Sequence, residues 1–112
     1  MSRDIRERAI PPLPIEVEPL GTHDWTHEGA GNRQWVYRFP NHYGASVVQG
    51  IYTYGGPEGF YELAVLTWDD DESELTYETP VTDDVLGWQT IEDIAGVLLR
   101  IAVLPERVLA RG

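Results

Sequence analysis

The middle of the chain alternates apolar and polar residues in several short segments, a period of two that is typical of β-strands. The strands predicted in this way cover residues 35–39, 45–54 and 60–68 and a fourth segment with Leu75 and Tyr77 that can extend to Val81. A glycine-rich run at 55–59 and an acidic run at 69–73 are expected to form turns. Because short connections favour consecutive antiparallel pairing, residues 34–81 are predicted to form a β-meander.

The first part of the chain has a different pattern. Residues 1–9 alternate charge signs and are expected to form a frayed arm or a short, weak helix. The proline-rich run at 11–14 excludes a helix, and alternation over 13–17 predicts an edge strand, where prolines are tolerated. Residues 1–20 are therefore expected to be an N-terminal arm with an edge segment, followed by a surface loop at 21–32.

Towards the C-terminus the period changes to that of a helix. Thr90 is a good N-cap, and apolar residues then recur at helical spacing, which predicts a helix over 91–104 that stops before Pro105. Val97, Leu99 and Val103 widen the apolar arc beyond what one sheet face needs. Either the rest of the chain covers the helix on two sides, or the helix contributes to a homodimer interface. The expected fold is α+β: an antiparallel four- or five-stranded β-meander with one C-terminal helix packed on one face.

Composition narrows the class of protein. With 112 residues, 42% of them hydrophobic, the chain fits one domain, 1–112, that can bury its own core. The absence of cysteine excludes disulfides, thiol catalysis and cysteine-bound zinc. A net charge of -11 argues against binding nucleic acid or an anionic membrane directly. Charged residues at 3–8 interrupt the place where the apolar part of a signal peptide would lie, and no apolar segment is long enough to span a bilayer, so we expect a cytoplasmic protein.

The charged residues are distributed unevenly. All eight basic residues are arginines, and none occurs between Arg38 and Arg100, an interval that holds twelve carboxylates. Soluble surfaces usually mix the two signs, so this interval predicts a docking surface for a basic partner, with exposed aromatic residues as anchors. The alternative is a solvated acidic surface that maintains solubility. The residues expected to bind a partner are Glu58, Asp69, Asp70, Asp71, Glu72, Glu74, Glu78, Asp83 and Asp84, with Tyr54 and Trp88 as anchors.

Other chemistry is not favoured by the sequence. The acidic loop at 69–74 lacks the glycine and the glutamate that an EF-hand needs at its sixth and twelfth positions, where Glu74 and Pro80 stand. His23 and His27 have the spacing of two metal ligands on a helix, but the surrounding glycines make that helix doubtful, so ordinary loop histidines are the main alternative. No serine stands in a nucleophile elbow. We expect no cofactor, no bound metal and no enzymatic activity.

Three segments carry a resemblance to known proteins: NHYGASVV at 41–48, YTYGGPEGFYELAVL at 52–66 and LTYETPVTDDV at 75–85. Together they resemble small uncharacterised acidic proteins encoded by actinobacterial phages and prophages, over roughly residues 35–104. The resemblance implies no catalytic residues, but small acidic phage proteins often inhibit host enzymes or defence factors, some by DNA mimicry. Taken together with the uncompensated carboxylates, this context predicts a protein in the host cell cytoplasm that docks on and inhibits a basic host protein, such as a nuclease, a defence factor or another DNA-binding factor. The alternative is a structural or assembly protein that forms homo-oligomers through its helix.

Overall fold

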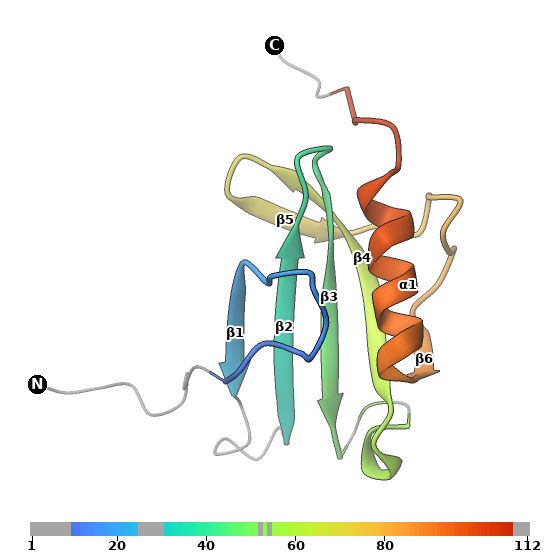
Figure 1. The fold of residues 1–112 in the computed structure, drawn as a ribbon. Coiled ribbons are helices and arrows are strands. Elements are labelled where there is room, and N and C mark those ends of the chain that lie inside the picture. The colour runs from blue at the N-terminus through green and yellow to red at the C-terminus, as the bar shows by residue number, and fades with distance from the viewer. Residues whose placement is uncertain (1–9, 25–30, 52, 54, 109–112) are drawn as a thin grey trace, which may run out of the picture.

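The computed structural model describes residues 10–24, 31–51, 53 and 55–108, which form a curled antiparallel sheet with one helix on one face (Figure 1). The predicted α+β meander with a C-terminal helix is confirmed. The elements in chain order are β1 (Gly21–Asp24), β2 (Asn32–Arg38), β3 (Tyr43–Gly50), the 3₁₀ turn η3 (Gly56–Glu58), β4 (Tyr61–Asp69), β5 (Glu72–Leu75), β6 (Leu86–Gln89) and α1 (Ile91–Ala102).

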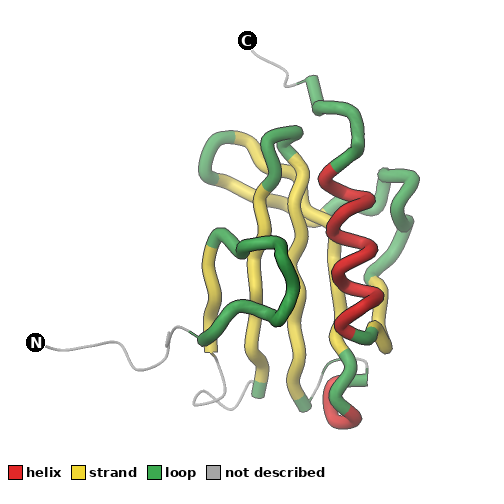
Figure 2. Tube along the Cα trace, viewed as in Figure 1, coloured by secondary structure: helices red, strands yellow, loops and turns green. Residues whose placement is uncertain are grey.

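The strands pair in sequence order from β1 to β5, and every pairing is antiparallel. The outer edge of β4 is shared by two short strands: β5 pairs with residues 66–69, and β6 pairs with residues 61–63. In Figure 2 the two short strands lie near opposite ends of β4. The segment between them, residues 76–85, connects one end of this edge to the other.

The N-terminal prediction of an edge strand at 13–17 is wrong. This segment is bent, with the Ile15 amide donating to the Leu13 carbonyl oxygen at 2.7 Å, and Leu13 is buried in the core. The edge strand is β1, which lies inside the predicted surface loop. It pairs with β2 and places the Thr22 hydroxyl where it accepts a bond from the Ile10 amide. The predicted arm at 1–9 lies outside the described residues.

The predicted fourth strand also differs from the structure. β5 begins at Glu72, inside the predicted acidic turn, and ends at Leu75, so neither Tyr77 nor Val81 belongs to it. The turn is shorter than predicted because Asp69 already pairs with Glu72. The strand β6 and its pairing with β4 were not predicted, since its four residues show no clear alternation.

The core lies between the sheet and a layer made of α1 and the N-terminal segment. Ile94, Leu98 and Ile101 of α1 are fully buried against β3 and β4. The N-terminal segment covers the same sheet face beside the helix, and the Trp35 indole donates to the Pro11 carbonyl oxygen at 3.0 Å. The chain's own N-terminal segment therefore covers part of the wide apolar arc of the helix.

Both ends of the helix are capped. The Thr90 hydroxyl accepts from the Asp93 amide at 3.1 Å, and the Asp93 carboxylate accepts from the Thr90 amide at 3.0 Å, so the predicted N-cap is confirmed as a capping box. At the other end, the buried amide of Asn41 donates to carbonyl oxygens of the last turn. The helix ends at Ala102, two residues before the predicted end.

Candidate acidic docking surface

The densest group of carboxylates lies on the hairpin formed by β4 and β5. Asp69 pairs with Glu72, so the turn contains two residues, Asp70 and Asp71. Asp70 has a positive φ of 53°, which tight hairpin turns require and which aspartate tolerates better than most residues. We call the five exposed carboxylates of this hairpin the acidic tip: Asp69, Asp70, Asp71, Glu72 and Glu74.

Among the described residues, two arginines from outside the acidic interval contact the acidic tip. Nη1 of Arg38 lies 3.5 Å from Oδ1 of Asp71, and Nη1 of Arg107 lies 3.4 Å from Oδ1 of Asp69. The fold therefore supplies positive charge that is absent from this interval of the sequence. Both pairs are solvent-exposed, where ion pairs have little energetic value, and carboxylates outnumber arginines on the described part of this hairpin and its contacts. The acidic tip keeps a negative field.

The hairpin is anchored to the sheet by Trp68. This side chain is buried, and its Nε1 donates to the Tyr37 carbonyl oxygen at 3.1 Å. The Arg38 guanidinium carbon lies 5.0 Å from the ring centroid, a cation–π contact. A buried anchor directly before Asp69 holds the first carboxylate of the acidic tip in a defined place.

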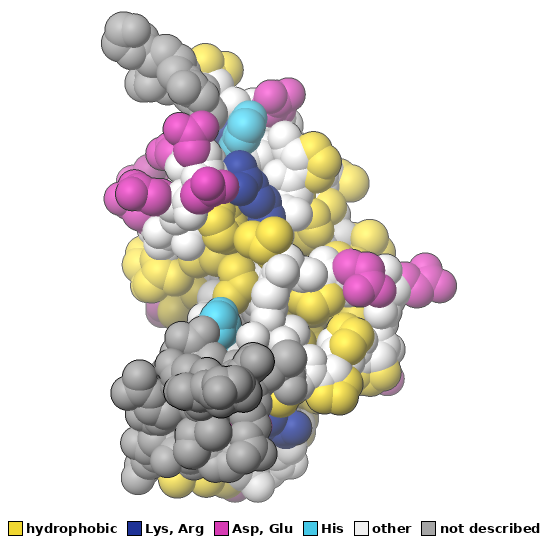
Figure 3. Space-filling model, turned by 90° about the vertical axis from the view of Figure 1, so that its left-hand side faces the viewer, with side chains coloured by type: hydrophobic (Ala, Val, Ile, Leu, Met, Phe, Trp, Pro, Cys, Tyr) yellow, Lys and Arg dark blue, Asp and Glu magenta, His cyan; other side chains and the backbone are white. Residues whose placement is uncertain are grey.

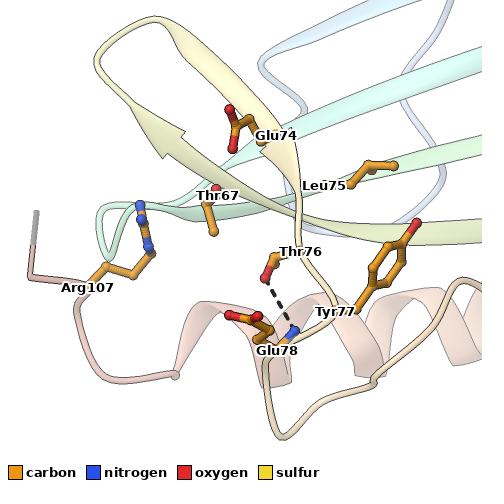
Figure 4. Close-up of a pocket in the computed structure, with 7 residues that line it drawn as sticks. All are labelled: Thr67, Glu74, Leu75, Thr76, Tyr77, Glu78 and Arg107. Carbon is orange, nitrogen blue, oxygen red and sulfur yellow. Dashed lines mark hydrogen bonds between the residues drawn. The ribbon is translucent and has the colours of Figure 1, made fainter.

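A hollow of about 350 Å³ borders the acidic tip on one side (Figure 4). Its lining residues are Thr67, Glu74, Leu75, Thr76, Tyr77, Glu78 and Arg107. Leu75 and Tyr77 are 53% and 44% exposed, so apolar surface lies next to the carboxylates. The sequence placed both side chains in one alternating strand, whereas the structure exposes both and leaves Tyr77 outside the strand. The reason is that β5 lies at the end of the sheet and the chain leaves the sheet after Leu75.

The other predicted carboxylates lie elsewhere. Glu58 belongs to η3, at the start of β4, and the acidic tip lies at the other end of this strand. The nine residues of β4 span roughly 30 Å, so Glu58 is far from the acidic tip. Asp83 and Asp84 lie in the loop before β6. There the backbone amide of Asp84 donates to the Thr82 hydroxyl, and the Asp84 carboxylate accepts a hydrogen bond from the Val85 amide. The predicted strip is thus divided among three places. In Figure 3 acidic side chains gather at the upper left, above hydrophobic side chains, and others stand apart from them at the top and at the right.

The two predicted aromatic anchors are not at the acidic tip. Trp88 is 56% exposed on β6 and packs against Phe60, with ring centroids 5.6 Å apart. Its φ of 57° is unusual for a bulky residue and coincides with the irregular pairing between β4 and β6. Tyr54 lies outside the described residues. Apolar contact beside the acidic tip comes instead from Leu75 and Tyr77.

Sequence reasoning therefore missed four participants: Arg38, Arg107, Leu75 and Tyr77. The two arginines come from other parts of the chain, and no local pattern indicates their return to the hairpin. A signal for the other two existed, since Glu72, Ser73 and Glu74 are all polar and interrupt the alternation before Leu75. That interruption is typical of a short exposed edge strand.

Within the described part of the chain, no three His, Asp or Glu side chains are grouped so that they could hold a metal ion. His27 lies outside it, so the suggested pairing with His23 stays untested. No described helix combines the length and apolar character needed to cross a membrane.

Comparison with known proteins gives no relative. No family model matches the chain, and no significant match is found among curated proteins or among solved structures. The resemblance to phage-encoded proteins stays a prediction.

Proposed function

We propose that this chain is a non-enzymatic binding protein whose acidic tip docks on a basic segment of another protein. The observation that carries the proposal is the concentration of five exposed carboxylates on one anchored hairpin, of which Asp71 pairs with Arg38 and Asp69 with Arg107. A concentrated negative field steers a basic partner and raises its association rate, most strongly at low salt.

Apolar surface beside the charges supports the same proposal. Electrostatic attraction mainly sets association rate and specificity, whereas packed apolar contacts supply much of the affinity. Leu75 and Tyr77 expose such surface next to Glu74 and Glu78 in the hollow. A basic segment that also carries apolar groups fits this combination, because its cations need carboxylates and its apolar groups need apolar contact.

In a phage setting, the partner is a basic host protein, such as a nuclease, a defence factor or another DNA-binding protein, met in the host cytoplasm. Docking on its basic surface inhibits it by covering the place where nucleic acid binds. The geometry favours a compact contact over mimicry of a DNA duplex. A duplex presents evenly spaced charges over its whole length, whereas these carboxylates are divided between the acidic tip, Glu58 and the loop with Asp83 and Asp84.

The test compares two triple variants that lose the same number of charges. Asp70→Asn, Glu72→Gln and Glu74→Gln neutralise the acidic tip, while Glu58→Gln, Asp83→Asn and Asp84→Asn neutralise carboxylates elsewhere. Calorimetric titration with a lysine-rich peptide should show binding at least about tenfold weaker for the tip variant, since charge-assisted contacts are each worth roughly 1 kcal/mol or more. Equal weakening in both variants, or no binding by the wild type, would contradict the proposal.

A second candidate function is self-assembly through the helix. Leu99 and Val103 are 60% and 79% exposed, and they stand four positions apart on one face of the helix end. Leu99 also lines an apolar hollow with Ile15, Val17 and Ala95. Sedimentation over a range of concentrations decides this candidate, because a strict monomer at the highest concentration excludes it.

A further inference from the structure

We infer that the basic partner binds by strand addition: an extended segment pairs with the free edge of β5 and lengthens the sheet by one strand. The inference rests on the proposed function and deepens it by naming the binding mode and the pattern of the segment. Three observations carry it: the hydrogen-bonding direction of β5, its exposure, and the placement of its side chains.

The backbone of β5 has one edge available. β5 is the last strand on the path from β1, and no other described strand pairs with its outer side. The Thr76 amide donates to the Val65 carbonyl oxygen at 2.9 Å, so residue 76 faces β4. Because antiparallel pairing alternates, residues 72 and 74 also face β4, and the amide and carbonyl groups of Ser73 and Leu75 point outward.

The free edge is also accessible. All four residues of β5 are exposed, whereas β1 at the other end of the sheet is half-buried throughout and β6 pairs irregularly. Natural proteins usually protect an open edge with a very short strand, charged side chains, proline or a bulge. β5 has the sequence Glu-Ser-Glu-Leu, and its register with β4 is regular, so its protection consists of its length and its two glutamates. The glutamates repel an acidic strand but attract a basic one, for which the regular edge is a template.

The side chains of β5 select the incoming strand by charge. Glu72 and Glu74 lie on one face of the sheet, and Ser73 and Leu75 lie on the other, because side chains alternate. A second copy of β5 would place glutamates opposite glutamates, which is unfavourable. A strand with lysine or arginine at alternate positions instead sets its cations beside Glu72 and Glu74. Its intervening residues lie beside Leu75, which favours β-branched apolar side chains there.

The incoming segment is therefore extended and alternates basic with β-branched residues. In this mode the main chain supplies affinity through the groups of Ser73 and Leu75, and the side chains supply specificity. Docking by charge alone needs no backbone hydrogen bonds, and this difference separates the two modes.

The first test uses a capped hexapeptide, Lys-Val-Lys-Thr-Lys-Val, and two N-methylated forms of it. One form is methylated on the amides of the Val and Thr residues and the other on those of the Lys residues, so charge is unchanged. A strand added to β5 directs only one of these two sets of amides at the protein. Strand addition therefore predicts that one form loses binding by about tenfold or more while the other keeps it. Equal affinities of the two methylated forms would overturn strand addition and leave the proposed function intact.

The second test changes the protein. Ser73→Pro removes an outward amide and leaves the bonds to β4 in place, and Ser73→Ala is the matched control that keeps the amide. We expect weaker hexapeptide binding for the proline variant and unchanged binding for the alanine variant. If the proline variant does not fold, as judged by circular dichroism, the pair of methylated peptides decides alone. Failure of the wild type to bind the unmodified hexapeptide would overturn the proposed function as well.

Discussion

Arg107 contacts Asp69 across 38 positions of the sequence, with Nη1 of the guanidinium 3.4 Å from Oδ1 of the carboxylate. The same guanidinium donates to the Trp68 carbonyl oxygen at 3.3 Å and lies over the Tyr43 ring. A residue near the C-terminus thus sets part of the charge balance of the acidic tip. Its removal should strengthen the negative field at a modest cost in stability.

Arg107→Gln should therefore bind a lysine-rich peptide more tightly than the wild type, by about three- to tenfold at low salt. The free energy of unfolding should fall by about 1–2 kcal/mol, because the pair with Asp69 is exposed but the bond to the Trp68 carbonyl oxygen and the contact with the Tyr43 ring are lost as well. Arg33→Gln is the matched control, since Arg33 bonds to Gln49 and does not contact the acidic tip. Weaker peptide binding by Arg107→Gln would show that the arginine helps to hold the partner rather than opposing it.

The parts of the fold that follow local rules could be predicted from the sequence. The helix and its N-cap depend on Thr90 and on apolar spacing within one segment, and β2, β3 and β4 follow a period of two. The edges could not be predicted in this way. β1 and β6 are four residues long and are defined by pairing with β2 and β4, so their own residues carry little signal.

In the candidate site, too, some features could be predicted from local sequence and others depend on long-range packing. The exposed carboxylates of the acidic tip come from one continuous segment, and the sequence indicated them. Their partial compensation by Arg38 and Arg107 depends on long-range packing, as does the separation of Glu58 from the acidic tip. A count of charges along the chain therefore overstated the size of the surface.

Asn41 connects the β2–β3 turn to the end of the helix. Its buried Nδ2 lies 2.9 Å from the carbonyl oxygen of Ile101 and 3.0 Å from that of Leu104, at the helix end, where carbonyl groups run short of helical partners. Asn41→Ala should lower the free energy of unfolding by about 2–3 kcal/mol, measured by urea denaturation. Asn41→Asp should cost more, because it removes the donor and places negative charge at the negative end of the helix dipole. An alanine variant as stable as the wild type would contradict this role.

The absence of a side chain at Gly44 gives the Trp68 side chain room to pack. A Cβ at this position would collide with the Tyr37 carbonyl oxygen and would lie 2.6 Å from Nε1 of Trp68. Gly44→Ala should reduce stability by about 3 kcal/mol, since backbone cannot move aside cheaply. Gly21→Ala is the control, because a Cβ there meets nothing within 4 Å. Thermal unfolding should separate the two variants clearly, and equal midpoints would contradict the account of how the hairpin is anchored.

The ionisation of Tyr37 makes the free energy of unfolding depend on pH in the alkaline range. Burial raises its pKa from 10.0 to about 12, with smaller contributions from Glu18 and Tyr61. Between pH 10 and 12 the folded state keeps the Tyr37 proton, whereas the unfolded state releases it. The stability that the protonated Tyr37 side chain provides is therefore complete below pH 10 and is lost as the pH rises through 12. The loss is about 2–3 kcal/mol.

Tyr37→Phe should remove this pH dependence. Within the described structure the buried hydroxyl has no hydrogen-bond partner, so the substitution should leave stability at pH 7 unchanged or raise it by about 1 kcal/mol. Urea denaturation at pH 7, 10 and 11.5 measures both effects. A marked loss of stability at pH 7 would indicate that the hydroxyl is satisfied in solution.

The most direct test of the central claim, that the acidic tip is the docking surface, is an NMR titration of the ¹⁵N-labelled protein with the lysine-containing hexapeptide. The account predicts that amide shifts change over residues 69–78, with the largest changes at Ser73 and Leu75, and that added salt reverses them. Signals from Leu99, Val103 and the loop with Asp83 and Asp84 should stay unchanged. Changes centred on the helix or on that loop, or no changes at low salt, would contradict the account.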